Sequence, residues 1–310
     1  MSAGAAPNAR WPGARARLSV LTPFFRDDPR PLIAALAAEA EARDGAVELV
    51  LLDDRGGDSA LSAAVSETVA ALPVPAALLT PERNEGRAKG RNRLSAAARA
   101  RHLLFVDSDM LPDAPDFLRR WLAEAEADAP VAFGGFSLDQ ARPEPRHRLH
   151  HALQLGAECL PAADRARNPA KHVFTSNLLV RRDVLEAEPF DESFSGWGWE
   201  DVEWGARVAG RFGVRHIDNP ASHLGLDTAA ALAAKYEQSP ANFARLLARH
   251  PEMVRGFPSY RAARMLRRLP ARAPLRRGLK ALVLAEAAPL RARTAAMRLY
   301  KAALYAEVVG

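Results

Sequence analysis

Two carboxylates, Asp107 and Asp109, directly follow a short apolar run at residues 103–106. Such a run is typical of a buried parallel strand, and open α/β sheets bind ligands at the carboxyl ends of their strands. Carboxylates at i and i+2 on one turn can face the same divalent cation, and hard oxygen ligands favour Mn2+ or Mg2+. A bare Asp-x-Asp also occurs in ordinary acidic loops. Its place directly after the strand favours a metal site whose cation also holds the phosphates of a nucleotide.

A second acidic pair, Asp53-Asp54, ends the apolar run at residues 47–52 and is followed by two glycines. Asp and Gly are usual turn formers, so the pair alone is equally consistent with a structural turn. A carboxylate at this position could also accept the imide N–H of a uracil or thymine ring. The neighbouring acid pair at a second strand end favours this functional interpretation.

Basic residues gather at a predicted helix start around Asn84, Arg87 and Arg91. Most of these charges, taken singly, are expected to be solvated. The free N–H groups and the dipole of a helix N-terminus add to the side-chain charge, so the segment could bind an anion such as a diphosphate.

The stretch at residues 195–204 holds three of the five tryptophans of the chain, with glycines between them and Glu200-Asp201 after them. An aromatic core cluster with a capping acid would also explain this composition. However, Gly198 would let the backbone approach a ligand, and the ring of Trp197 could stack on a sugar. A carboxylate beside such rings is partly desolvated, which suits Asp201 to act as a general base.

Histidines supply one further candidate ligand. His223 follows the last predicted strand, and a neutral imidazole suits Mn2+, so we expect it to complete a metal shell begun by the aspartates. His147, His150 and His151 lie in an irregular segment without an acid in matching register, and we expect them at the surface.

Apolar runs alternate with helical patterns along the first half of the chain, which predicts right-handed crossovers and a mostly parallel sheet. The expected strands are 18–23, 47–52, 76–79, 103–106, 131–136, 172–180 and 214–217. The expected helices are 29–44, 58–72, 85–101, 115–127, 200–212 and 228–250, with broken helical pieces over 258–309, and residues 137–170 are expected to be an irregular insert.

Composition limits the class of protein. The hydrophobic fraction of 48% and charged fraction of 26% are those of a globular chain, and a single cysteine, Cys159, fits a reducing compartment. The first residues lack the apolar core of a secretory signal, so a cytoplasmic protein is expected.

Charge is distributed unevenly along the chain. Residues 261–310 contain 12 Lys/Arg and 2 Asp/Glu, a net +10, so residues 1–260 contain 31 and 35, a net −4. This basic segment could lie on an anionic membrane at the inner face or could be a solvated helical extension packed on the core. Nucleic acid is not expected as a partner, since the segment has few aromatic residues for stacking.

The motifs occur in the order found in GT-A fold, family 2-like inverting glycosyltransferases, which the chain resembles over residues 17–225. The Trp-Gly-x-Glu-Asp element also resembles chondroitin-polymerase and β-1,4-galactosyltransferase domains. The resemblance rests on these segments: Thr22-Pro23, Asp53-Asp54-Arg55-Gly56-Gly57, Asn84 to Asn92, Asp107-Ser108-Asp109 and Trp197 to Asp201.

This resemblance implies a GT-A (Rossmann-like) α/β domain at 17–225, after a disordered start at 1–16 and before a helical, basic extension at 226–310. The implied donor-binding residues are Thr22, Asp53, Asp54, Asn84, Arg87, Arg91, Asp107, Trp197 and Gly198. Asp107, Asp109 and His223 would bind the metal, Glu200 would hold a hydroxyl, and Asp201 would deprotonate the acceptor.

We therefore expect a metal-dependent inverting glycosyltransferase. It would transfer the sugar of a nucleotide-diphosphate sugar, a UDP-sugar in the first place, to a hydroxyl of a saccharide or glycolipid. Two alternatives stay open from the sequence. One is a sugar-phosphate nucleotidylyltransferase, although Thr22-Pro23-Phe24-Phe25 supplies no glycine-rich phosphate loop. The other is a non-catalytic transferase-like subunit docked on a membrane.

Overall fold

The computed structural model describes residues 5–13 and 15–310, which fold into two compact units. Unit 1 comprises Met1–Ala141, Glu158–Ser193 and Trp204–Gly225, and unit 2 comprises Arg142–Ala157, Phe194–Glu203 and Leu226–Gly310. The sequence predicts domain boundaries at 16/17 and 225/226. The units are not contiguous in sequence, since two short segments before residue 204 fold with the C-terminal helices.

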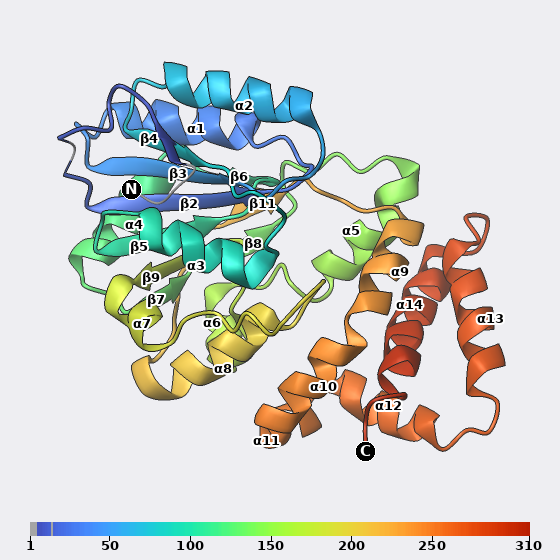
Figure 1. Ribbon diagram of the computed structural model, residues 1–310. Helices are drawn as coiled ribbons and strands as arrows, with labels where there is room; N and C mark the ends of the chain where they lie inside the picture. Colours follow the sequence, from blue (N-terminus) through green and yellow to red (C-terminus); the bar gives the residue numbers. More distant parts are fainter. Residues whose placement is uncertain (1–4, 14) are drawn as a thin grey trace. The chain divides into compact units, whose positions relative to one another are not determined.

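Unit 1 is built on a mixed sheet (Figure 1). Among the described residues the strand order is β1 (Ala5–Pro7), β4 (Ala76–Leu79), β3 (Val47–Asp53), β2 (Leu18–Phe24), β5 (His102–Val106), β9 (Asn177–Arg181), β7 (Val131–Phe133) and β10 (Arg215–His216). The strands β4, β3, β2 and β5 run parallel, and β10 runs parallel to β7. β9 is antiparallel to both of its neighbours. The predicted α/β architecture with a helical C-terminal region is therefore confirmed.

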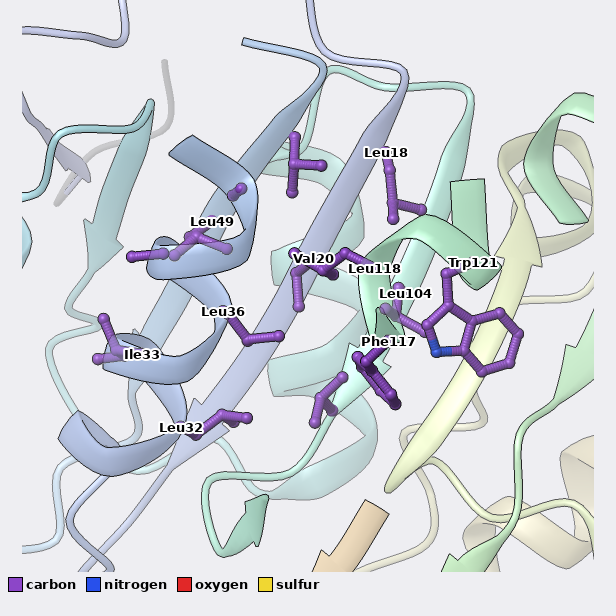
Figure 2. Packing of buried hydrophobic residues seen from close by; sticks show 14 of the residues in the cluster. Leu18, Val20, Leu32, Ile33, Leu36, Leu49, Leu104, Phe117, Leu118 and Trp121 are labelled. Atoms are coloured by element: carbon purple, nitrogen blue, oxygen red, sulfur yellow. The ribbon is translucent and has the colours of Figure 1, made fainter. Parts of the chain in front are cut away.

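Helices cover both faces of this sheet because its strands are apolar on both sides. Side chains alternate along each strand, so Leu18 and Val20 point to one face and Leu21 to the other. The first face packs against α1 (Arg30–Glu41), α2 (Ser59–Ala71) and α4 (Phe117–Glu126). Figure 2 shows residues of α1 and α4 beside those of β2, β3 and β5. The second face packs against α3 (Arg87–Ala97), α7 (Arg182–Ala187) and the part of α8 (Glu200–Phe212) that begins at Trp204.

A smaller sheet follows the carboxyl end of β5. In it β11 (Ala221–His223) lies between β6 (Met110–Pro112), to which it is antiparallel, and β8 (Phe136–Ser137), to which it is parallel. His223 pairs in register with Met110, directly after the Asp107-Ser108-Asp109 turn. The small sheet therefore brings two segments more than a hundred residues apart to the same strand end.

The described residues at the start of the chain differ from the disordered segment predicted at 1–16, of which residues 1–4 and 14 lie outside the described residues. Ala5–Pro7 forms β1 against β4, and the side chain of Asn8 donates to the carbonyls of Val69, Leu72 and Val74 at 2.9–3.3 Å. Trp11 is buried beneath the Arg99 guanidinium, 3.7 Å from the ring centroid. These contacts fix the segment, and they involve partners too distant in sequence for composition to indicate.

Residues 137–170 also differ from the predicted irregular insert. They contain β8, η1 (Pro145–His147), α5 (Arg148–Leu155), α6 (Ala162–Arg165) and the first residues of η2 (Pro169–His172). Leu149 in α5 is fully buried in the unit 2 core. The apolar residues of α5 are separated by Arg and His residues and form only a short amphipathic pattern, which explains why this helix was not predicted.

Unit 2 is helical. Besides α5 it contains α9 (Ala229–Gln238), α10 (Pro240–Arg249), α11 (Pro251–Arg255), α12 (Pro258–Arg267), α13 (Arg272–Leu284) and α14 (Leu290–Tyr305). Pro240 begins a new helix and so divides the single helix predicted at 228–250, since proline cannot donate the next backbone hydrogen bond. Met297, Tyr300 and Tyr305 of α14 are buried. The C-terminal helices thus belong to the core of a folded unit.

Within the described part of the chain, no helix combines the length and apolar character needed to cross a membrane.

Candidate functional site

The acid pair at the end of β3 anchors the loop before α3. The Asp54 carboxylate accepts the backbone N–H groups of Glu85 at 2.7 Å and Gly86 at 3.1 Å, and the Asn84 side chain donates to it at 2.9 Å. Burial raises the pKa of Asp54, the two backbone donors oppose this rise, and the charges of Glu85 and Asp53 add to it. The structure therefore brings together three residues predicted to lie around the donor: Asp53, Asp54 and Asn84.

Asp53 is buried and closes its own turn. Its carboxylate accepts the backbone N–H of Arg55 at 3.0 Å and the hydroxyl of Ser62. Arg55 has a φ of 57°, and its guanidinium donates to the carbonyl of Pro81 at 2.6 Å. Both acids therefore have local structural partners, as the turn interpretation requires. Thr22 is buried near the end of the neighbouring strand β2, where it pairs in register with Leu51.

The basic start of α3 is largely committed to ion pairs. Arg91 is almost fully buried and donates to Asp107 at 3.1 Å, so two predicted donor residues contact each other. Lys89 and Arg93 both pair with Glu85, at 3.2 and 2.6 Å. Arg87 is exposed in the first turn of the helix. Its exposed guanidinium lies where an anion could reach it.

Asp109 and His223 are in direct contact, with 3.0 Å between a carboxylate oxygen and Nε2 of the imidazole. The imidazole packs on the Phe136 ring, 5.1 Å between centroids. Burial acts to lower the pKa of His223, but the charge and hydrogen bond of Asp109 outweigh it and raise the pKa, with smaller contributions from Glu158 and Asp107.

Gly225 leaves room for the Asp109 side chain. A Cβ atom at this position would lie 2.2 Å from its Oδ2 atom and 2.8 Å from its Cβ and Cγ atoms. The backbone N–H of Leu224 also donates to the carbonyl of Asp109 at 2.8 Å. The chain after β11 is therefore shaped around Asp109.

Three metal ligands were predicted: Asp107, Asp109 and His223. In the structure, Asp109 and His223 are in contact. Across residues 5–13 and 15–310 no group of three or more His, Cys, Asp or Glu side chains is placed to hold a metal ion. Asp107 instead pairs with Arg91. A carboxylate oxygen and an imidazole nitrogen in contact are nevertheless a donor pair that suits Mn2+.

A buried polar network, not predicted from the sequence, holds the small sheet together. The Asp113 carboxylate accepts the hydroxyls of Ser137 in β8 and Ser222 in β11, the latter at 2.6 Å. Gln140 donates to the same carboxylate at 3.0 Å. Ser222 precedes His223, so the network fixes the strand that carries the imidazole. Single Ser and Asp residues at these spacings give no sequence signal.

In unit 2, residues 195–199, directly before α8, form a bend in which several residues have a positive φ. Gly196, Gly198 and Trp199 have φ values of 72°, 88° and 77°. Asn242, 1% exposed, donates to the carbonyls of Ser195 at 2.9 Å and Gly198 at 3.0 Å. The backbone of Trp199 has a conformation that residues other than glycine rarely adopt, and the hydrogen bonds of Asn242 help to stabilise it.

The three tryptophans of this stretch have separate roles. The indole of Trp199 donates to the hydroxyl of Tyr305 at 2.9 Å and packs against the rings of Phe243 and Phe257. Trp204 belongs to unit 1, where its indole donates to the Glu188 carbonyl and its ring stacks in the core. The interpretation of the tryptophans as part of an aromatic core is thus correct for Trp199 and Trp204.

Trp197 and Trp199 are both half-buried, whereas Trp204 is fully buried. The ring of Trp197 lies 5.3 Å from that of Tyr236 and is partly accessible.

Glu200 and Asp201 begin α8. Glu200 is buried, with 4% of its surface exposed, whereas Asp201 is half-buried. Two residues on, Glu203 is fully buried and lies 3.4 Å from Arg249 and 3.5 Å from His250. Two of the three acids are thus enclosed, and Asp201 is the more accessible one.

His150 is not a surface residue, contrary to the sequence expectation. It is buried, and its Nδ1 accepts the backbone N–H of Asp227 at 2.8 Å. Asp227 in turn pairs with Lys235 at 2.6 Å. The ring therefore fixes the start of the segment that leads into α9.

Residues 19–188 match the model of the family described as glycosyl transferase family 2. None of the curated proteins compared with the chain matches it. The solved structures that resemble it include a mannosyltransferase from Pyrobaculum calidifontis in complex with GDP-Man and Mn2+, with a TM-score of 0.55 and 20% identity over 97% of this chain and 89% of that one.

Two further structures show the same fold. A fragment of S. aureus TarS has a TM-score of 0.52 and 16% identity, over 92% of this chain and 89% of that one. Glucosyl-3-phosphoglycerate synthase from Mycobacterium tuberculosis, in complex with Mn2+, UDP-Glc and phosphoglyceric acid, has a TM-score of 0.51 and 18% identity, over 76% and 80%. These similarities support the predicted GT-A-like fold.

Proposed function

Because the chain belongs to glycosyl transferase family 2 and is a nucleotide-sugar glycosyltransferase, we propose that it transfers the sugar of a UDP-sugar, with inversion and with a divalent cation, to a hydroxyl of a saccharide or glycolipid. The observation that carries the metal-dependent part is the contact between Asp109 and His223 at the end of β5. The sequence alternatives, a nucleotidylyltransferase and a non-catalytic subunit, have no observation in their favour.

The donor would bind at the carboxyl ends of β2, β3 and β5. Asp53 and Asp54 would lie beside the nucleobase together with Thr22, and Asn84 would fix the loop that Asp54 anchors. Arg87 and Arg91 would face the diphosphate, and Asp107 the ribose. The support is that these residues form two contacting pairs: Asp54 with Asn84, and Asp107 with Arg91.

Asp109 and His223 would hold Mn2+ or Mg2+. Their oxygen and nitrogen atoms are 3.0 Å apart, and Gly225 leaves the carboxylate its space. A cation bound there would neutralise charge on the diphosphate as it leaves. Two of the similar structures contain Mn2+ together with a nucleotide sugar, GDP-Man in one and UDP-Glc in the other, which is consistent with this assignment.

Asp201 would act as the general base and Glu200 would bind a sugar hydroxyl. Asp201 would take the proton of the acceptor hydroxyl, whose oxygen bonds to the anomeric carbon as the bond from that carbon to the diphosphate breaks. The ring of Trp197 and the backbone of Gly198 would contact the donor sugar. The support is that Asp201 and Trp197 are both half-buried, so that part of each side chain is accessible. The element lies beyond the residues that the family model matches.

Two variants test the two halves of the proposal separately. Asp201→Asn should abolish transfer yet leave the affinity for a UDP-sugar nearly unchanged, because the amide cannot accept the proton. Asp109→Ala should weaken Mn2+-dependent binding of the donor, measured by calorimetry. Asp164→Asn, at an exposed ion pair with Arg167, is the control.

Normal turnover by Asp201→Asn would contradict the assignment of the base. Donor binding that is indifferent to Mn2+ in the unsubstituted protein would contradict the metal dependence. A thermal-shift screen of nucleotide sugars with and without Mn2+ would identify the donor first.

The same proposal places the enzyme in the cytoplasm, peripherally at the inner face of the membrane, with residues 261–310 toward the lipid. The net charge of this segment, +10, supports it. A glycolipid acceptor would then be reached at the surface where the enzyme binds.

A further inference from the structure

Some cations of residues 261–310 are neutralised within the fold, whereas others are exposed, among them Arg277, Arg291 and Arg298 outside α12. Those along one flank of α13 are neutralised within the fold, since Arg272 and Arg276 pair with Glu307 at 3.7 and 3.2 Å, and Lys280 pairs with Glu237 at 2.6 Å. Attraction between such pairs and an outside anion is weak because the nearby carboxylate cancels the charge. The high net charge of the segment therefore overstates the charge available to a partner.

The cations of α12 are different. Arg261, Arg264 and Arg268 are exposed, and no acidic side chain in the described part of the chain pairs with any of them. Arg268 directly follows the last residue of α12 and keeps a helical conformation, so the spacing of three, then four residues places the three arginines on one side of the helix. Arg267 is excluded from this group because it donates to the carbonyl of Val309 at 2.6 Å.

Apolar side chains lie on the same side. Met265 is 72% exposed and Leu269, just after the helix, is 44% exposed. On the opposite side, Tyr260 and Ala263 are buried in the unit 2 core. α12, labelled in Figure 1, is thus held to the unit by one side and presents a stripe of three arginines, a methionine and a leucine on the other.

The chemistry of this stripe fits a lipid surface. Exposed apolar side chains can enter the acyl boundary while long arginine side chains reach the phosphates of the headgroups. A nucleic acid would satisfy the charges but not Met265 and Leu269, and the stripe has no aromatic ring on which a base could stack.

We propose that the α12 stripe, formed by Arg261, Arg264, Met265, Arg268 and Leu269, docks the enzyme on a bilayer that contains anionic lipids. The inference rests on the proposed function only in that a glycolipid acceptor would lie in the same bilayer. It narrows the membrane contact from the whole basic segment to a single helix face.

Each exposed arginine near an anionic leaflet strengthens binding about fivefold, so removing three should weaken vesicle binding by roughly a hundredfold. The test is sedimentation of the full chain with vesicles of phosphatidylcholine and 30% phosphatidylglycerol (about a third anionic lipid, enough for a negative surface potential). Binding should fall sharply in high salt and be absent with phosphatidylcholine alone, because screening removes the electrostatic part.

A matched pair of variants separates location from net charge. Replacing Arg261, Arg264 and Arg268 with Gln should remove vesicle binding, whereas the same replacement of Arg272, Arg276 and Lys280 should have a much smaller effect. Met265→Ser with Leu269→Ser should weaken binding without changing its salt dependence. Circular dichroism and thermal melts of each variant show whether it has folded.

Equal losses of vesicle binding in the two triple variants, no vesicle binding by the unsubstituted chain, or binding to duplex DNA in place of vesicles would each overturn the inference. Transfer to a water-soluble acceptor should be unchanged when the stripe is removed. Failure of transfer in the unsubstituted protein would count against the proposed function and not against the docking surface.

Discussion

Asn242→Ala tests whether a single buried amide holds the turn that carries Asp201. Asn242 lies in α10, 1% exposed, and its amide nitrogen donates to the carbonyls of Ser195 and Gly198 at 2.9 and 3.0 Å. The turn contains Trp199 at a φ of 77°, a conformation that costs on the order of 1–3 kcal/mol. The hydrogen bonds of Asn242 must help to offset this cost.

The expected loss follows from the two bonds. A hydrogen bond contributes about 1 kcal/mol net, and a carbonyl left without a donor costs more when water cannot reach it. Ser195 is exposed, so its carbonyl can be rehydrated, whereas Gly198 is half-buried. The loss of these two hydrogen bonds and the small void left by the side chain should together lower the free energy of unfolding of unit 2 by about 2–3 kcal/mol.

Urea denaturation of the variant measures the stability loss, and steady-state transfer at saturating donor measures the effect on catalysis. Relaxation of Trp199 toward a common conformation would displace Asp201, two residues on, so kcat should fall at least about tenfold, since small displacements of a reacting group are costly. Gln238→Ala is the control, because Gln238 borders Gly196 in the same turn while its side chain donates to the carbonyl of Ala234.

The reasoning is refuted if Asn242→Ala loses no more unfolding free energy than Gln238→Ala, or if it loses stability but keeps its full kcat. The first result would mean that aromatic packing alone holds the turn. The second would mean that the geometry of the turn does not govern the proposed base.

Two further predictions concern unit 1. Gly225→Ala should displace the Asp109 carboxylate, because the new Cβ would lie 2.2 Å from its Oδ2 atom; Mn2+ affinity measured by calorimetry should fall about 10- to 100-fold, and an unchanged affinity would contradict the role of Asp109. Burial, followed by the charges of Lys171, His216 and Arg165, lowers the pKa of His172 to about 4. Between pH 6.5 and 4, His172 is therefore protonated in the unfolded chain but neutral in the folded chain. The free energy of unfolding should fall as the pH falls through this window, by at most about 3 kcal/mol. Urea denaturation at pH 7 and pH 5 should show a smaller pH dependence for His172→Gln than for the unsubstituted protein, and equal slopes would show that another group titrates.

Much of unit 1 could be predicted because its signals are local. The apolar runs that became β2, β3, β4 and β5 are each bounded by turn residues, and the pleat of a strand makes both faces readable from the order of side chains. The strand ends then locate Asp53 and Asp107 at one edge of the sheet, whatever the connecting helices contain.

Local pattern was a poorer guide where helices and strands depend on distant partners. The expected strand at 131–136 is divided between β7 and β8, and the segment around His150 forms a helix whose buried side faces the core of unit 2. Asn8 and Trp11 are ordered by backbone carbonyls and an arginine 60 to 90 residues away.

The chemistry of the candidate site could be named from residue types, but its contacts could not. Asp109 and His223 are 114 residues apart and meet because β11 adds to β6, and the Asp113 network that aligns β11 has no sequence signature. Asn242 likewise reaches the turn at Ser195 only through the folding of unit 2.

Charge gives the clearest contrast. Composition established that residues 261–310 are basic, which is a sum over residues and needs no fold. Which of those charges remain available depends on what each side chain faces: Glu307 and Glu237 neutralise the flank of α13, whereas the arginines of the α12 stripe face no acid in the described structure. Ion pairs form between groups a few ångströms apart in space, and only the tertiary structure determines those distances.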